Sequence, residues 1–335
     1  MVSLNAFKGV ALVTALLALL VVVMGAYVRL SHAGLSCPDW PGCYGRMTVA
    51  DGPGQVAAAN ALYPERPLDT GRAWKEMVHR YLAGLLGLAI LVMATLAVRR
   101  RRMPGQQVAV PVFLVGLVVF QALLGMWTVS TLLKPAVVTA HLLGGMATLA
   151  LCWWVFLRQS VRVQAALETR GPRLAILLGL IVVVLQIALG GWTSANYAAL
   201  ACPDFPLCQG RLWPPMSFAE GFQLWHGLGR DFEGGVLDGE ARVAIHMVHR
   251  LGALVTLIYV GGLAVYLLRR RLGRGVSIAA WIMLLTLIAQ LTLGVSNVVF
   301  KLPLVVAAAH NGVAALLLLS VISVYHMCSS PRSAL

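Results

Sequence analysis

Four histidines in this chain have the spacing of a paired ligand site. His79 and His249 occupy the same position in the tetrapeptide Met-Val-His-Arg, which occurs twice and each time opens a long apolar run. His141 and His310 lie near the start of two further apolar runs. Ionisable side chains inside membrane segments are costly and mark functional sites. We therefore treat these four imidazoles as the candidate site.

Two imidazoles that come from two helices of one bundle, at one depth, are what axial ligation of a haem iron requires. The sequence therefore predicts one haem in each half of the chain. The alternative, that each histidine makes an interhelical hydrogen bond, stays open. Zinc fits less well, because the cysteines lie in predicted outer loops and neither histidine pair has a third ligand within the helices. We assign no role to the loop residues His32 and His226 or to His326 near the C-terminus.

One acidic residue distinguishes the two copies of the tetrapeptide. Glu76 stands three residues before His79, whereas His246 stands three residues before His249. Residues three apart share one face of a helix, so we expect Glu76 to point toward whatever His79 holds. Such a carboxyl is suited to proton transfer, which predicts a catalytic role. A carboxylate favoured by the positive end of the helix dipole is the alternative. The role of His246 is left open.

Two cysteine pairs share the seven-residue motif Cys-Pro-Asp-aromatic-Pro-x-Cys. The first runs from Cys37 to Cys43 and the second from Cys202 to Cys208. Both fall in predicted outer loops, on the oxidising side of a bacterial membrane, so each pair is expected to form a disulfide. A structural staple and a redox-active pair that relays electrons are both open. The other two cysteines are interpreted as packing residues: Cys152 and Cys328.

Long apolar segments must position these residues. Apolar residues make up 59% of the 335 residues and charged residues only 11%, whereas a soluble domain carries about 25% charged residues. A helix needs roughly 20 apolar residues to cross a bilayer. Eight runs meet this condition: residues 9–30, 77–98, 108–130, 136–157, 174–194, 243–268, 276–298 and 304–327. We expect an all-α polytopic membrane protein.

The order cysteine loop, histidine helix, glutamine helix, histidine helix occurs twice, which indicates an internal repeat. Gln121 matches Gln290 in this repeat, and a glycine recurs in four of the runs: Gly25, Gly125, Gly190 and Gly294. Small residues at helix contacts explain these glycines most simply. Each copy has four helices, so both copies have the same orientation in the membrane. We predict two pseudo-symmetric four-helix bundles, residues 1–165 and 166–335.

The net charge of +14 reflects topology rather than nucleic-acid binding. Arginines crowd three short loops, after the second, fourth and sixth predicted helices: residues 99–102, 158–173 and 269–274. Of the twelve acidic residues only Glu168 lies there. Short loops rich in Lys and Arg mark the cytoplasmic face. We therefore expect a bacterial inner-membrane protein with both termini on the cytoplasmic side and the histidines toward the periplasmic side. The first run is expected to be a retained helix rather than a signal peptide.

Two long loops fall on the outer side, at residues 31–75 and 195–242. In the second loop, large apolar side chains recur at helical spacing: Phe218, Phe222, Trp225 and Leu228. This spacing predicts an amphipathic helix, which would lie at the membrane interface or cover the mouth of the bundle.

Taken together, these motifs resemble the haem A synthase family over nearly the whole chain. The resemblance rests on Val28-Arg29-Leu30-Ser31, Gly34-Leu35-Ser36, the first cysteine motif, Glu76-x-x-His79-Arg80, His141, His249-Arg250 and His310. It implies an eight-helix enzyme of two pseudo-symmetric halves. Such an enzyme oxidises the C8 methyl of haem O to the formyl group of haem A, for use in cytochrome c oxidase.

The resemblance also implies roles for individual residues. His249 and His310 would ligate a haem b cofactor in the C-terminal half. His79 and His141 would hold haem O in the N-terminal half, and Glu76 matches the family's essential acidic residue.

Further expectations concern the loops and the partners. The resemblance pairs Cys37 with Cys43, whereas Cys202 and Cys208 have a counterpart in only some members. On electrostatic grounds, three arginines near the outer surface are expected to contact haem propionates: Arg29, Arg80 and Arg250. The implied partners are haem O and membrane lipid. Haem O synthase, cytochrome c oxidase assembly factors and a second copy of the chain are left open.

Three other classes of protein remain to be compared with this interpretation. A quinol-linked di-haem b cytochrome would make no haem A and would leave the difference between Glu76 and His246 unexplained. A transporter built on parallel repeats would need helix breaks near the midplane. A haem-farnesylating prenyltransferase would need aspartate-rich cytoplasmic loops, whereas these loops are rich in arginine, so we reject it.

Overall fold

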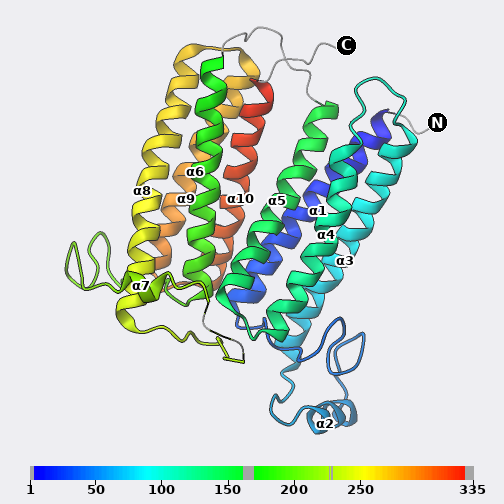
Figure 1. Cartoon of the computed structure of the whole chain (residues 1–335), viewed down its shortest axis with the longest axis vertical. Coiled ribbons are helices and arrows are strands. Elements are labelled where there is room, and N and C mark those ends of the chain that lie inside the picture. The colour runs from blue at the N-terminus through cyan, green and yellow to red at the C-terminus, as the bar shows by residue number, and fades with distance from the viewer. Residues whose placement is uncertain (1–3, 161–169, 226, 228, 329–335) are drawn as a thin grey trace.

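A computed structural model describes residues 4–160, 170–225, 227 and 229–328; Glu168 and His226 lie outside these ranges. The described part contains eight helices long and apolar enough to cross a membrane. They are α1 (Leu4–Leu30), α3 (Thr70–Arg99), α4 (Ala109–Ser130), α5 (Pro135–Ser160), α6 (Arg170–Ala195), α8 (Gly239–Arg270), α9 (Arg274–Val299) and α10 (Leu304–Met327). Two short helices, α2 (Pro53–Leu62) and α7 (Phe218–Gly221), lie in the long connections (Figure 1). The predicted all-α membrane architecture is confirmed.

The long helices form two rings of four. In the first ring, α1 and α4 each contact both α3 and α5. In the second ring, α6 and α9 each contact both α8 and α10. Helix α3 therefore faces α5 across the first bundle, and α8 faces α10 across the second. The shared order fits the predicted pseudo-symmetry, and the predicted boundary between residues 165 and 166 lies outside the described residues.

The two rings pack against each other directly. Helix α1 contacts α10, and α5 contacts both α6 and α10. Across this interface the Trp153 indole N–H donates to the Ser323 hydroxyl oxygen (2.9 Å). One cluster of buried apolar side chains runs through both bundles, from Phe7 in α1 to Val324 in α10. The bundles are thus one packed body rather than two domains on a linker.

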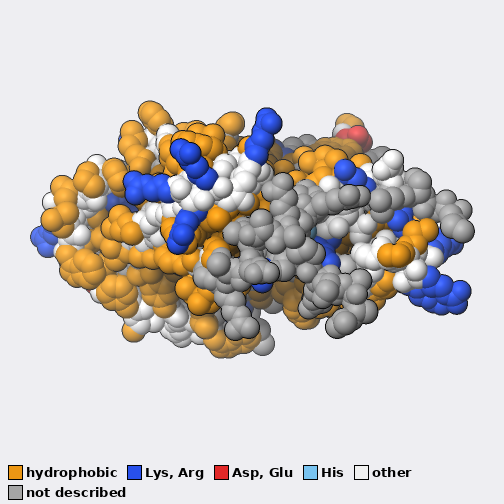
Figure 2. All heavy atoms as spheres, turned by 90° about the horizontal axis from the view of Figure 1, so that it is seen from above, with side chains coloured by type: hydrophobic (Ala, Val, Ile, Leu, Met, Phe, Trp, Pro, Cys, Tyr) orange, Lys and Arg blue, Asp and Glu red, His pale blue; other side chains and the backbone are white. Residues whose placement is uncertain are grey.

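The two ends of the molecule differ in charge. Both termini lie at one end (Figure 1), over which Lys and Arg side chains are spread (Figure 2). The long connections with α2, α7 and both cysteine motifs lie at the opposite end, called the loop end below. Every acidic residue that the structure describes belongs to the loop end or to the adjoining first two turns of α3 and α8. This separation is the one that the predicted topology requires.

Helices α3 and α8 begin earlier than their apolar runs suggest. The sequence prediction starts both several residues later, whereas the structure starts them at Thr70 and Gly239. The carboxylates of Asp69 and Asp238 cap them, each accepting the backbone N–H three residues along, at 3.0 and 2.7 Å. The first turns of both helices are polar. Hydropathy therefore did not reveal that the helices extend beyond the segment that is apolar enough for lipid.

The predicted amphipathic helix in the second long loop is wrong. Of the described residues between 218 and 228 only Phe218–Gly221 are helical, and Leu228 lies outside the described residues. Gly221 sits so close to α8 that a Cβ atom on it would lie 2.7 Å from the Ala241 carbonyl oxygen. Farther on, Gly227 turns the chain with a φ of 79°, which a glycine adopts freely. Backbone contact with α8, rather than the spacing of apolar residues, therefore determines the conformation of this segment.

Replacing Asp238 with alanine removes the acceptor that caps α8. We expect the free energy of unfolding to fall by about 1 kcal/mol, seen as a lower thermal midpoint by circular dichroism in detergent micelles. Asp238→Asn is the matched control, because asparagine caps a helix as well as aspartate does. An alanine variant that melts with the wild type would show that this cap contributes nothing.

Candidate functional site

A large cavity lies at the level of the candidate ligands. Its volume is about 1670 Å³, beyond the range of roughly 300–1,000 Å³ for a pocket that holds one small molecule. The four histidines all line it: His79, His141, His249 and His310. Most other lining residues are apolar, and they come from both bundles. The structure therefore brings the four histidines to one continuous space.

Each bundle presents its two histidines from helices that face each other. His79 lies on α3 and His141 on α5, across the first ring. His249 on α8 and His310 on α10 have the same relation in the second ring. All four helices start at the loop end (Figure 1), so the imidazoles share one depth. Two rings opposed in this way can bracket a flat ligand from both sides.

A glycine on a flanking helix receives each imidazole. We call these glycines the imidazole seats, and they come from α1, α4, α6 and α9. In the first bundle, a Cβ atom on Gly25 would lie 3.0 Å from His79 Cε1, and one on Gly125 would lie 3.6 Å from His141 Cε1. In the second bundle, a Cβ atom on Gly190 would lie 3.3 Å from His249 Cε1, and one on Gly294 would lie 3.2 Å from His310 Cε1. At three of the four positions an added methyl group would displace the ring. The glycines that the sequence marked as helix contacts thus shape the candidate site.

Buried ring nitrogens make this cavity suitable for a ligand that carries a metal. The Nδ1 atoms of His79, His141 and His310 are buried without a hydrogen-bond partner. An unpaired buried polar atom costs about 1–3 kcal/mol, so a ligand that orients and polarises these rings would stabilise the site. No group of three His, Cys, Asp or Glu side chains converges in the described part of the chain. The donor set is therefore two pairs of imidazoles in apolar surroundings, which suits haem.

Amide side chains accompany the histidines of the second bundle. The Gln186 Nε2 atom lies 3.1 Å from His249 Nδ1 and donates to the His249 carbonyl oxygen at 3.0 Å. The Gln290 Nε2 atom lies 3.2 Å from His310 Nε2. Both imidazoles of this bundle therefore have a side-chain neighbour that limits their rotation.

The first bundle lacks this arrangement. The repeat places Val21 where the second half has Gln186, and no amide of the described residues forms a hydrogen bond with His79 Nδ1. Gln121 matches Gln290, but its buried Nε2 atom has no partner. Sequence reasoning missed Gln186, because it has no counterpart in the repeat. The available signal was a lone amide inside an apolar helix, which is costly without a role.

Both cysteine motifs are closed by disulfides, as predicted: Cys37–Cys43 and Cys202–Cys208. Inside each loop an aspartate accepts two backbone N–H groups. Asp39 accepts those of residues 44 and 45 (2.6 and 2.7 Å), and Asp204 those of residues 209 and 210 (2.6 and 2.8 Å). The Gly210 N–H, followed by that of Gln209, holds the pKa of the Asp204 carboxyl below its ordinary value. The shared aspartate of the motif therefore folds the loop.

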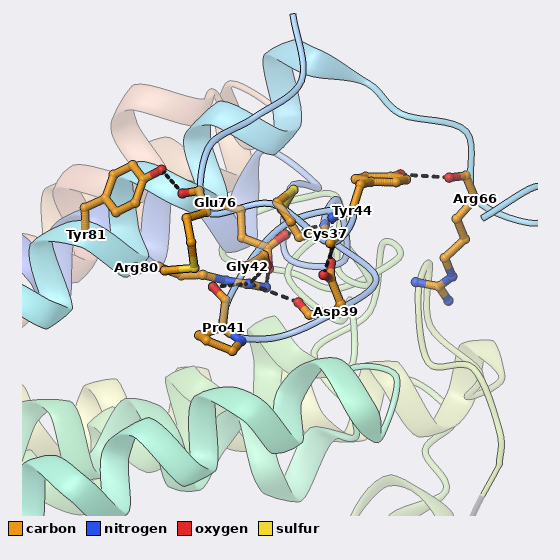
Figure 3. Close-up of a disulfide and its surroundings, with 12 residues drawn as sticks. Cys37, Asp39, Pro41, Gly42, Tyr44, Arg66, Glu76, Arg80 and Tyr81 are labelled. Carbon is orange, nitrogen blue, oxygen red and sulfur yellow. Dashed lines mark hydrogen bonds and ion pairs between the residues drawn. A yellow bond between two sulfur atoms is a disulfide. The ribbon is translucent and has the colours of Figure 1, made fainter. Parts of the chain in front are cut away.

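Helix α3 holds the first cysteine loop (Figure 3). Arg80 donates to three loop carbonyl oxygens, those of Asp39 (3.0 Å), Pro41 (3.1 Å) and Gly42. The Glu76 Oε1 atom accepts from Arg80 (2.5 Å), and Oε2 accepts the backbone N–H of Cys37 (2.9 Å). Glu76 is buried and lines the cavity. Both of its oxygens are therefore engaged in holding the loop over the bundle.

Helix α8 holds the second cysteine loop with a different acceptor. Arg250 donates to the carbonyl oxygens of Cys202 (3.0 Å), Asp204 (2.8 Å) and Leu207 (2.8 Å). The Cys202 N–H donates to His246 Nδ1 (3.2 Å), the place that Glu76 has in the first bundle. One structural task is thus performed by a carboxylate in one half and by an imidazole in the other. The guanidinium groups of Arg80 and Arg250 are both bound to loop backbone.

Arg29 connects the two bundles. From the end of α1 its Nη2 atom donates to the Ser194 carbonyl oxygen at the end of α6 (2.9 Å). Its guanidinium carbon lies 4.3 Å from the centre of the Tyr197 ring. The Arg29 Nε atom is buried without a partner, and the residue lines the cavity. Among the three arginines predicted to contact an anionic ligand group, Arg29 thus keeps a buried donor unused.

Known proteins resemble this chain along nearly its whole length. The model of the COX15-CtaA family, described as cytochrome oxidase assembly protein, matches residues 8–322. A protein named heme A synthase from Shewanella oneidensis is 44% identical over 95% of this chain and 96% of its own length. Heme A synthases of Caulobacter sp. (strain K31) and Geobacillus kaustophilus are 28% and 26% identical; each alignment covers 91% of this chain, and 91% and 86% of those proteins. The similarity therefore includes both bundles and both cysteine loops.

Replacing Arg250 with lysine keeps the charge but removes the planar fork that binds three carbonyl oxygens. We expect a mild reductant to open the Cys202–Cys208 disulfide several-fold faster, measured by thiol labelling and mass spectrometry. The Cys37–Cys43 disulfide serves as the internal control. Arg242→Lys is the matched variant, because Arg242 is half-buried on the same helix and donates to the Asp238 carbonyl oxygen rather than to the cysteine loop. Equal reduction rates in wild type and Arg250→Lys would show that the Arg250 hydrogen bonds do not protect this disulfide.

Proposed function

This chain belongs to the COX15-CtaA family of cytochrome oxidase assembly proteins, and from that premise we propose that it is an enzyme that converts haem O to haem A. The C8 methyl group of haem O is oxidised stepwise, through the alcohol, to a formyl group, and the product serves cytochrome c oxidase. The observation that carries this proposal is the opposed histidine pair in each bundle, both pairs lining one cavity.

The second bundle is the proposed cofactor site. His249 and His310 would hold haem b, and the amides of Gln186 and Gln290 beside them support permanent binding because they limit ring rotation. Bound haem b supplies one-electron redox chemistry. In the first bundle, His79 has no such amide neighbour among the described residues. A less constrained ligand suits a substrate that must bind and leave, so haem O is assigned there, between His79 and His141.

Glu76 is the proposed catalytic residue. It is the only acidic side chain among the cavity-lining residues that the structure describes. It is 5% exposed, and its ion pair with Arg80 (2.5 Å) fixes the carboxylate at the cavity, on the helix that carries His79 and three residues before it. There it would hold or accept a proton at the methyl group that is oxidised. Its bond to the Cys37 N–H supports this role, because the loop fixes the direction of the carboxylate.

Charge and topology complete the proposal. The unused Nε donor of Arg29 supports a contact with a haem propionate, whereas Arg80 and Arg250 serve the loops. The concentration of arginine at the terminal end supports a bacterial inner-membrane protein with both termini in the cytoplasm. The candidate haem sites would then lie toward the periplasm. Haem O synthase and cytochrome c oxidase assembly factors are the partners that this placement suits.

Replacing Glu76 with glutamine keeps an acceptor for the Cys37 N–H but removes the charge. We expect haem b to stay bound and haem A formation to fall by about 10²-fold or more. The protein would be purified from a host that makes haem O but no haem A, and its haems separated by reverse-phase chromatography. Glu76→His, which copies the second bundle, should keep the loop anchored and also lose turnover.

Two outcomes would contradict this assignment. Undiminished haem A from Glu76→Gln would remove Glu76 from the mechanism. Haem B alone in the wild type, with haem O available, would instead favour a di-haem cytochrome without haem-modifying activity.

Replacing His249 or His310 with alanine should abolish the low-spin b-type absorbance of the purified protein, because each change removes one axial nitrogen. His141→Ala is the matched control, since it changes the equivalent helix of the first bundle and should leave this absorbance in place. A b-type spectrum that survives both second-bundle changes would exclude these histidines as ligands.

A further inference from the structure

The cavity of the first bundle reaches the membrane-facing surface between α3 and α4. Five residues of these helices line it at this point: Gly84, Gly87, Val118, Val119 and Ala122. Three of them, Gly84, Val119 and Ala122, are also exposed, and Val119 is 56% exposed. A residue that lines a cavity and is exposed on the outer side of a membrane helix marks an opening toward lipid. We call these five residues the α3/α4 portal.

The second bundle has larger side chains at the matching positions. In the repeat, Gly84 and Gly87 correspond to Leu254 and Leu257 on α8, and Ala122 corresponds to Leu291 on α9. The leucines also line the cavity, so the positions are equivalent in space as well as in sequence. Where the first bundle has hydrogen atoms or a methyl group, the second has isobutyl groups. Leu254 and Leu257 are exposed as well, 51% and 39%, so the cavity reaches the surface in both bundles. The opening is wider in the first bundle because its side chains are smaller.

The packing at the portal leaves room for a ligand. A Cβ atom on Gly84 would meet nothing within 4 Å, and one on Gly87 would first meet the Val118 side chain at 3.9 Å. Directly inside the portal, Gln121 is 8% exposed and lines the cavity, and its Nε2 atom has no partner. An orphaned donor in this position is expected to meet a polar group of whatever occupies the cavity.

We propose that the α3/α4 portal admits haem O sideways from the membrane and holds its isoprenoid tail during the reaction. This inference rests on the proposed function, because it takes haem O as the substrate. An isoprenoid chain between apolar side chains and lipid leaves no apolar surface in water, while the porphyrin lies between His79 and His141. Haem b has no such tail, and the leucines of the second bundle narrow the corresponding gap.

The portal can be closed with the residues of the second bundle. In the double variant Gly84→Leu/Ala122→Leu we expect haem A formation to fall at least tenfold, with the amount and spectrum of bound haem b unchanged. Gly116→Leu is the matched control: Gly116 is an exposed glycine on α4 with nothing within 4 Å of its Cβ position, and it does not line the cavity. That variant should make haem A at the wild-type rate.

A second measurement does not depend on turnover. In Gly84→Cys, added haem O should slow alkylation of the introduced cysteine by a lipid-soluble maleimide several-fold, and haem B, which lacks the tail, should protect it less. Gly116→Cys should show no protection. The two native free cysteines, Cys152 and Cys328, are buried and give little background.

The outcomes separate the portal from the function. Wild-type haem A output from the double leucine variant, or absence of protection at position 84, would overturn the portal and leave the enzyme assignment standing. Absence of haem A from the wild type would overturn the function itself. If the leucine variant lost haem b as well, its fold would be damaged, and protection of the Gly84→Cys variant would then decide.

Discussion

Four half-buried imidazoles at membrane depth are the constraint on which the rest of this structure depends. A polar ring taken out of water needs a partner and a place among tightly packed helices. Two helices facing each other across a ring of four supply one imidazole each, and glycines on the flanking helices make room for both rings. The four-helix ring, rather than the single helix, is therefore the smallest unit that can hold such a pair.

The two bundles share a backbone plan and differ mainly in what lines the cavity. Val21 and Gln186, Glu76 and His246, and Gly84 and Leu254 are pairs of matching positions. At these positions the first bundle has an isopropyl group, a carboxylate and a hydrogen atom, and the second has an amide, an imidazole and an isobutyl group. A duplicated scaffold can thus support two roles, because a role resides in the residues of a site and not in the fold. The direction of every difference agrees with a substrate site paired with a cofactor site.

The large features of the fold were predictable, because hydropathy and the repeat are strong signals. The eight long helices and both disulfides are confirmed, since apolar runs of this length have few alternatives in a membrane. The prediction was wrong, or no prediction was made, where contacts between distant segments determine the structure. Gly221 ends a short helix against α8, and an ion pair between Arg66 and Asp231 (3.2 Å) joins the two long loops. No local pattern encodes either contact.

The candidate site shows the same division between local and long-range information. The histidines and Glu76 stood out because ionisable residues are rare in apolar segments. The partners of Glu76 did not, because the Cys37 N–H lies far away in the chain and is not a side chain at all. Arg80 was predicted to contact a propionate, and its bonds to loop carbonyls could not be foreseen from charge alone. Gln186 lacks a repeat partner, so comparison of the two halves could not reveal it.

Arg80 and Arg250 bind the backbone of the cysteine loops through hydrogen bonds, and the Arg250 guanidinium carbon also lies 5.7 Å from the centre of the Phe205 ring. Within the motif, Trp40 is replaced by Phe205 and Gly42 by Leu207, while the cysteines, prolines and aspartate are the same. The hydrogen bonds that anchor each loop therefore do not depend on which aromatic side chain the motif carries. Trp40 and Phe205 both line the cavity and are 41% and 52% exposed, so the aromatic rim of the cavity differs between the bundles while the backbone bonds that hold each loop stay the same.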